Sequence, residues 1–220
     1  IVVYPDEISP MNEYFVSSWT FLHQISKLLL SFNWSFANVS QFIIFITAAL
    51  FFLGIALTIN SATKSVYLSI LVALIILIFQ KNFGDTDYPS LFFSEHTYGM
   101  ISLATATLVF GLLFYGSLFL AGLFSSLLIC IHPLIGIWIN AIIIISLIIN
   151  KYFFQKNIES NKFIKGFILG IAFTVGSFIY HVISTENFSS QFNFEAYNNY
   201  IKFWEGHRTQ TEYHIEYFLK

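Results

Sequence analysis

The chain has 220 residues, of which 56% are hydrophobic, 20% aromatic and only 10% charged, with a mean hydropathy of +0.71. Soluble domains carry about 25% charged residues, so the composition indicates an integral membrane protein. The formal net charge of -2 argues against a nucleic-acid partner, because phosphate binding needs concentrated positive charge. The single cysteine, Cys130, excludes an intrachain disulfide and a cysteine cluster for zinc.

Residues 1–40 are predicted to form an outer segment with a helix in the membrane interface. Ser9-Pro10 is typical of a helix start. From Glu13 to Phe32 apolar residues, Trp19 and Leu22 among them, recur at helical spacing, but polar residues interrupt them too often for a membrane span. The chain begins with Ile1-Val2-Val3-Tyr4, which reads like the end of a span. We therefore expect a fragment of a longer protein.

Residues 41–183 are predicted to form about six membrane spans. Phe42 to Ile59 and Val66 to Phe79 indicate a helical hairpin. The run from Met100 to Asn150 carries no charged residue and is too long for one crossing of about 20 residues. Tyr115-Gly116-Ser117 and His132-Pro133 divide it into three helices. A last span from about Gly166 to Ile183 precedes a polar outer tail, residues 184–220, so the fold class is an all-α polytopic transmembrane bundle with an interfacial amphipathic helix.

The charged residues predict the orientation of these spans. Lys64 and the four lysines between Lys151 and Lys165 fall on one side of the membrane, which the positive-inside rule makes the cytoplasm. Of the 12 acidic residues, only Glu159 then lies inside. We therefore expect chemistry at the outer face, although long external segments also collect polar residues of every kind without a function.

Two acidic pairs and one arginine are the candidate catalytic and binding groups of the outer segments. Asp6 and Glu7 stand where a preceding span would leave the membrane, and a partly desolvated carboxylate there can act as a general base. Asp85 and Asp87 can share one Mg²⁺ or Mn²⁺ ion that bridges to a phosphate. The alternatives are a solvated helix junction and a turn built by the Asp side chains. Arg208, the only arginine, is suited to bidentate binding of a phosphate.

Two stripes of small and polar residues at helical spacing predict a second group of binding residues. The first stripe consists of His132, Gly136 and Asn140, and the second of Gly166, Gly170, Thr174, Ser177 and His181. Small residues let helices approach closely, and ionisable groups near lipid favour a protein interior or a polar cavity. We expect the two stripes to face each other, with His132 and His181 at the outer ends. The alternative is that each histidine only bonds nearby backbone.

The order of these features resembles the GT-C-type membrane glycosyltransferases and the related bacterial polysaccharide polymerases. The resemblance rests on layout rather than on one motif. The chain departs from those families because the first span is absent, no large soluble outer domain follows, and the spans are too few for the complete fold. The positions that carry the resemblance are Asp6-Glu7, Asp85-Thr86-Asp87-Tyr88, Glu95-His96-Thr97-Tyr98 and Leu128-Ile129-Cys130-Ile131-His132-Pro133-Leu134.

The resemblance implies sugar transfer from a polyprenyl-phosphate donor at the outer face of the bacterial inner membrane, in polysaccharide biosynthesis. Asp6 or Glu7 would be the base, and Arg208 would clamp an anion. Asp85, Asp87 and His96 would surround the donor phosphate or a cation. The alternative is a non-enzymatic transporter or subunit of a membrane complex, whose interior histidines line an ion path. That alternative needs polar groups at mid-membrane, where the sequence offers only Asn140 and a few hydroxyls.

Overall fold

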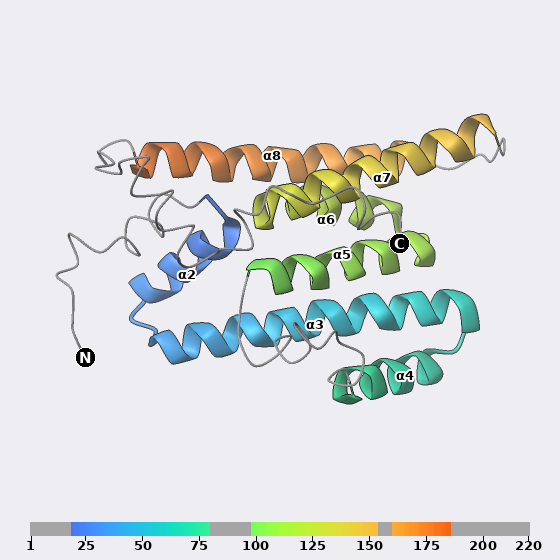
Figure 1. Cartoon of the computed structure of the whole chain (residues 1–220), viewed down its shortest axis with the longest axis horizontal. Coiled ribbons are helices and arrows are strands. Elements are labelled where there is room, and N and C mark those ends of the chain that lie inside the picture. The colour runs from blue at the N-terminus through green and yellow to red at the C-terminus, as the bar shows by residue number, and fades with distance from the viewer. Residues whose placement is uncertain (1–18, 80–97, 154–159, 186–220) are drawn as a thin grey trace, which may run out of the picture. The chain divides into compact units, whose positions relative to one another are not determined.

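The computed structural model describes residues 19–79, 98–153 and 160–185, and every regular element in these ranges is an α-helix (Figure 1). The chain divides into two compact units, Ile1–Ser184 and Thr185–Lys220. The described helices belong to the first unit, apart from the last residue of the last helix. The predicted tail beyond Thr185 lies outside the described residues. The helices are α2 Phe21–Ser31, α3 Phe36–Thr63, α4 Val66–Phe79, α5 Tyr98–Tyr115, α6 Leu118–Ile131, α7 Pro133–Tyr152 and α8 Ser160–Thr185.

The uncharged run lies in three helices, α5, α6 and α7, which are separated from one another at the two predicted breaks. Gly116 ends α5 with a φ of 90°, a conformation that glycine adopts without steric cost. His132 separates α6 from α7, and Pro133 occupies the first position of α7, where its missing N–H is not needed. Local backbone chemistry therefore sets both boundaries.

Three of the described helices, α3, α7 and α8, are long and apolar enough to cross a membrane. Only 17% of the most apolar stretch of α3 and 22% of that of α8 is buried, so most of their apolar side chains face outward, where a bilayer would cover them. Helices α4, α5 and α6 are apolar but shorter. At 1.5 Å per residue α6 rises about 21 Å, against about 30 Å for the hydrocarbon core.

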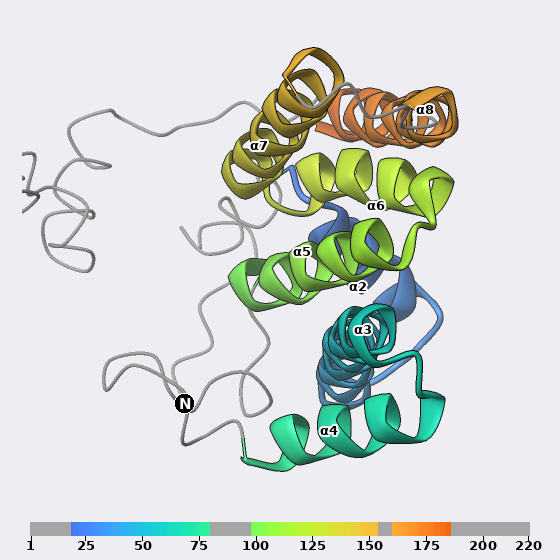
Figure 2. The same cartoon turned by 90° about the vertical axis from the view of Figure 1, so that its right-hand side faces the viewer.

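The helices of this unit follow one another in space in the order α4, α3, α5, α6, α8, with α7 beside α6 (Figures 1 and 2). Glycines make two of these approaches close. A Cβ atom on Gly111 would overlap the carbonyl oxygen of Gly54, which joins α5 to α3. A Cβ atom on Gly166 would likewise overlap the carbonyl oxygen of Phe119, which joins α8 to α6. Such backbone contact is typical of helix packing in membranes.

Two buried hydroxyl groups of the described helices donate to carbonyl oxygens of their own helices. Thr47 donates to the carbonyl oxygen of Ile43 at 2.8 Å, and Thr105 donates to that of Ile101 at 2.7 Å. Both side chains are buried. Because these bonds stay within one helix, the two hydroxyl groups are satisfied without water.

Helix α2 is the described part of the predicted interfacial helix, and it packs on the bundle. Leu22 is buried in a cluster with residues of α3, α5 and α6, while Leu28 and Phe32 stay exposed. The helix ends at Ser31 because Asn33 turns the chain at a φ of 63° and Ser35 caps α3. Some apolar side chains of α2 therefore pack against the other helices, and others are exposed at the surface of the bundle.

Candidate functional site

Helices α6 and α8 lie side by side and run in the same direction. The backbone of Gly122 approaches Phe163, and four residues further along Ser126 contacts Gly170. The carbonyl oxygen of Ser126 also accepts a hydrogen bond from Thr174 Oγ1 at 3.1 Å. Because residue numbers rise together on both helices, the last turns of α6 and α8 lie at the same end of the bundle. We call it the histidine end, since His132 follows α6 and His181 lies in the last turns of α8.

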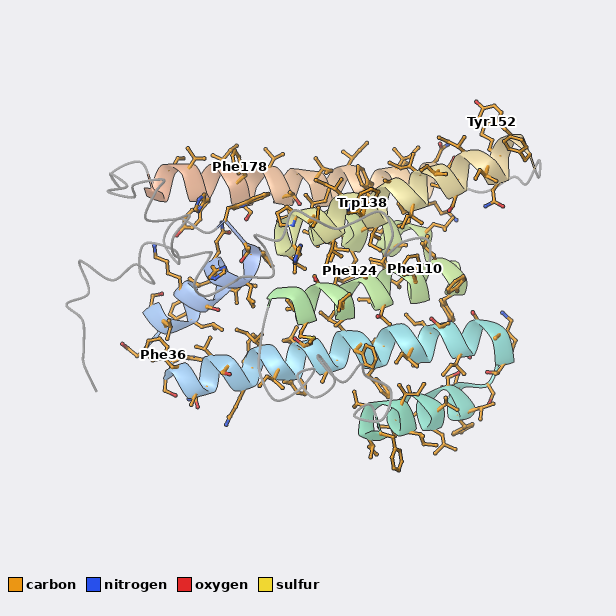
Figure 3. The ribbon with its side chains drawn as sticks, in the orientation of Figure 1. Phe36, Phe110, Phe124, Trp138, Tyr152 and Phe178 are labelled. Atoms are coloured by element: carbon orange, nitrogen blue, oxygen red, sulfur yellow. The ribbon has the colours of Figure 1, made fainter. Side chains whose placement is uncertain are left out.

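The first turns of α3 and α5 also reach the histidine end. Val39 of α3 and Ile101 of α5 belong to the same core cluster as Ile131 of α6. In Figure 3, Phe36 and Phe178 mark this end, and Tyr152 marks the opposite one. Four of the five described lysines lie toward the opposite end, in the turn after α3, the last turn of α7 and the first two turns of α8. They are Lys64, Lys151, Lys162 and Lys165.

His132 links α6 to α7 through its backbone and its ring. Its N–H donates to the carbonyl oxygen of Leu128 at 2.9 Å, which closes α6. Its ring Nδ1 accepts from the N–H of Ile135 at 3.4 Å, which caps α7. An accepting Nδ1 places the proton of the neutral ring on Nε2. His132 therefore has a local structural role, as the alternative interpretation proposed.

His181 lies one turn beyond a polar contact between α8 and α2. Gln24 Nε2 donates to the carbonyl oxygen of Ser177 at 2.9 Å, and Ser177 Oγ donates to Gln24 Oε1 at 2.8 Å. Trp19 Nε1 donates to Ser177 Oγ at 3.4 Å, and its ring packs edge-on against Phe178. These contacts fix the start of α2 beside the last turns of α8. The sequence did not predict this pairing, because an isolated Gln on an amphipathic helix is compatible with solvent.

The two small-residue stripes do not face each other, contrary to the expectation from sequence. Gly136 of α7 packs on the backbone of Leu128 and Ile129, whereas Gly170 of α8 packs on Leu123 and Ser126. Both stripes therefore pack on α6, each from its own side. Helical spacing identified the contact faces, but a small-residue face carries no information about which neighbour it will meet.

Six of the predicted site residues lie outside the described residues. They are Asp6, Glu7, Asp85, Asp87, His96 and Arg208. Residues 19–79, 98–153 and 160–185 include no Asp or Glu, and they hold no group of three potential metal-ligating side chains. The catalytic and metal-binding predictions on these six residues therefore stay predictions.

No protein-family model, curated protein or solved structure matches this chain. Its function is therefore inferred from its own residues and from the layout described above.

His23, on α2, gives a prediction about pH. Burial lowers the pKa of its imidazole, and its Nδ1 is hydrogen-bonded to Thr20 Oγ1. A lowered pKa in the folded state means that the unfolded state binds more protons, so stability falls as pH drops through the ordinary value of about 6.5. We expect the unfolding temperature in detergent to decrease between pH 7.5 and pH 5. His23→Gln should reduce this decrease; an unchanged pH dependence would contradict the assignment.

Proposed function

We propose that the protein is a glycosyltransferase-like enzyme of the bacterial inner membrane that acts at the outer face on a polyprenyl-phosphate-linked sugar. In this proposal the helices form a packed support with about six membrane crossings. The lysine-bearing end lies in the cytoplasm and the histidine end lies outside. Asp6 or Glu7 acts as general base, and Asp85, Asp87 and His96 surround the donor phosphate, with or without Mg²⁺ or Mn²⁺.

The observation that carries the proposal is that three segment boundaries meet at the histidine end. Trp19, which follows the segment with Asp6 and Glu7, donates a hydrogen bond to Ser177 of α8. The first turn of α5, which follows the segment with Asp85, Asp87 and His96, contributes Ile101 to the histidine-end cluster. The end of α8, from which the chain continues toward Arg208, lies there too.

Hydrogen-bond chemistry at the histidine end also favours an anionic substrate. His132 lies at the junction of two helices, and an imidazole is a side chain that can hydrogen-bond a phosphate oxygen. The ring is held by Ile135, so a bound phosphate would meet a positioned group. His132 and His181 are accordingly the proposed substrate-binding residues among those that the structure describes.

The alternative of a transporter or subunit receives less support from the described helices. An ion path needs polar side chains that can bind and release an ion near mid-membrane. The buried hydroxyls of Thr47, Thr105 and Ser125 instead donate to carbonyl oxygens of their own helices. These groups stabilise the helices and leave no donor hydrogen for a transported anion or a proton relay.

A binding measurement with Arg208 variants tests the proposal. Arg208→Ala in the full-length protein should weaken binding of a radiolabelled polyprenyl-phosphate sugar about 10- to 150-fold, as expected for loss of a charged hydrogen bond of about 1.5–3 kcal/mol. Arg208→Lys should retain part of the affinity, because it keeps the charge but loses the bidentate geometry. Equal affinity of Arg208→Ala and the unaltered protein would favour the transporter or subunit interpretation.

A further inference from the structure

Asn140, in the middle of α7, has a side-chain amide whose nitrogen is hydrogen-bonded and whose oxygen is not. Its Nδ2 donates to the carbonyl oxygens of Ser125 and Gly136, both at 2.7 Å. Its Oδ1 is buried and accepts no hydrogen bond from the described residues. The whole residue is only 6% exposed. A buried amide oxygen without a donor is costly in an apolar interior, so this atom points to a missing partner.

Rotation of the amide cannot satisfy the oxygen. Exchange of Oδ1 and Nδ2 would place the oxygen against the two carbonyl oxygens of Ser125 and Gly136, which repel it. The hydrogen-bond network therefore fixes the orientation, and the partner has to be a donor that approaches Oδ1.

The described hydroxyls of this region have no hydrogen left to give. Each has one hydrogen, and each is hydrogen-bonded to a backbone carbonyl. They are Ser102 to Gly99, Thr105 to Ile101, Ser125 to Gly122, Ser126 to Gly122 or Leu123, and Thr174 to Ser126. Their oxygens, however, keep lone pairs and still accept hydrogen bonds.

We propose that Asn140 Oδ1 and Ser125 Oγ bind one buried water molecule between α6 and α7. Water supplies two hydrogens, one for the amide oxygen that lacks a donor and one for a hydroxyl oxygen whose own hydrogen already bonds Gly122. Ser125 is the partner because its own carbonyl oxygen already holds the Asn140 amide, which brings the two residues together. A metal ion fits less well, since it would need several oxygen ligands and negative charge, and the described residues include no Asp or Glu.

The proposed water would close a polar network that spans the α6–α7 hairpin. Asn140 lies eight residues after His132, which corresponds to about 12 Å along the helix axis. Gly136, between them, packs directly on the backbone of α6. The water is therefore enclosed at mid-hairpin and holds α6 and α7 together below the histidine end, independently of any substrate.

Infrared difference spectra of the full-length protein in lipid bilayers, recorded in ordinary water and in H₂¹⁸O, test this site. The O–H stretching band of a bound water shifts with ¹⁸O, whereas serine and threonine bands keep their oxygen and do not shift. Subtraction of the Asn140→Leu spectrum from that of the unaltered protein removes the bands of bulk and lipid-bound water, and we expect one ¹⁸O-shifted band to remain. Asn150→Leu is the matched control, because Asn150 also donates to a carbonyl four residues earlier on α7, but its hydrogen bond is exposed at the end of the helix. That control should keep the band.

Two results would overturn the proposal. One is an identical set of ¹⁸O-shifted bands in Asn140→Leu and in the unaltered protein. The other comes from Ser125→Ala, which keeps the backbone carbonyl and serves even if Asn140→Leu fails to fold. Loss of the hydroxyl acceptor should move the water band to a different frequency, and an unchanged band in Ser125→Ala would contradict the bridge.

Discussion

One of the two substitutions Asp6→Asn and Glu7→Gln in the full-length protein is expected to lower glycolipid or glycan formation by about 100- to 10,000-fold. The reason is that loss of a positioned general base removes proton transfer from the incoming hydroxyl in the transition state. Both variants should insert in the membrane and fold normally, because Asn and Gln keep the size and shape of Asp and Glu. Product formation from a polyprenyl-phosphate-linked sugar in isolated membranes is the measurement.

Glu13→Gln is the control for these two variants. Glu13 follows the same pair in the sequence but takes no part in the proposed site, so its replacement should leave product formation unchanged. Full activity in both Asp6→Asn and Glu7→Gln would exclude these residues as the base and would remove the main chemical reason for an enzyme.

Gly166→Leu is expected to be the most destabilising single substitution among the described helices. A side chain there meets the carbonyl oxygen of Phe119, which belongs to the backbone of α6 and cannot rotate away. Helices α6 and α8 would have to separate, and overpacking of this kind costs typically about 1–3 kcal/mol or more. Thermal unfolding in a mild detergent, followed by circular dichroism, measures the effect.

Gly176→Leu provides the matched comparison on the same helix. A Cβ atom at Gly176 meets no heavy atom within 4 Å, and the residue is exposed. Leucine also has a higher helix propensity than glycine by about 0.5–1 kcal/mol, so this variant should be as stable as the unaltered protein or slightly more stable. If Gly166→Leu and Gly176→Leu unfold at the same temperature, the close approach of α6 and α8 is wrong.

The helix boundaries were predictable where local chemistry decides them. Gly116 and Pro133 act within their own turns of backbone, and the boundaries between α5 and α6 and between α6 and α7 lie at these residues. The beginning of α3 at Phe36 was predicted six residues too late, since its cap at Ser35 lies in a polar stretch that resembles a loop. Boundaries set by one side chain next to polar neighbours are harder to read from a sequence.

The sequence did not predict which helix contacts each small-residue face, because that contact depends on how helices distant in the sequence pack together. The spacing of Gly166 and Gly170 correctly indicated a close contact, but that contact is with α6 and not with α7. The two hydrogen bonds between Gln24 and Ser177 join residues 153 positions apart, and neither residue type predicts such a contact. The acids of the candidate site lie outside the described residues, so their convergence remains a prediction.

Accessibility of single cysteines in intact cells tests the orientation on which the outer-face site depends. Asn33→Cys lies in the exposed turn between α2 and α3 at the histidine end, and Lys64→Cys lies in the exposed turn between α3 and α4 at the lysine end. The native Cys130 is buried, so the unaltered protein gives the background. A membrane-impermeant maleimide should label Asn33→Cys in intact cells and Lys64→Cys only after permeabilisation. Labelling of Lys64→Cys in intact cells, with Asn33→Cys protected, would contradict the proposed orientation.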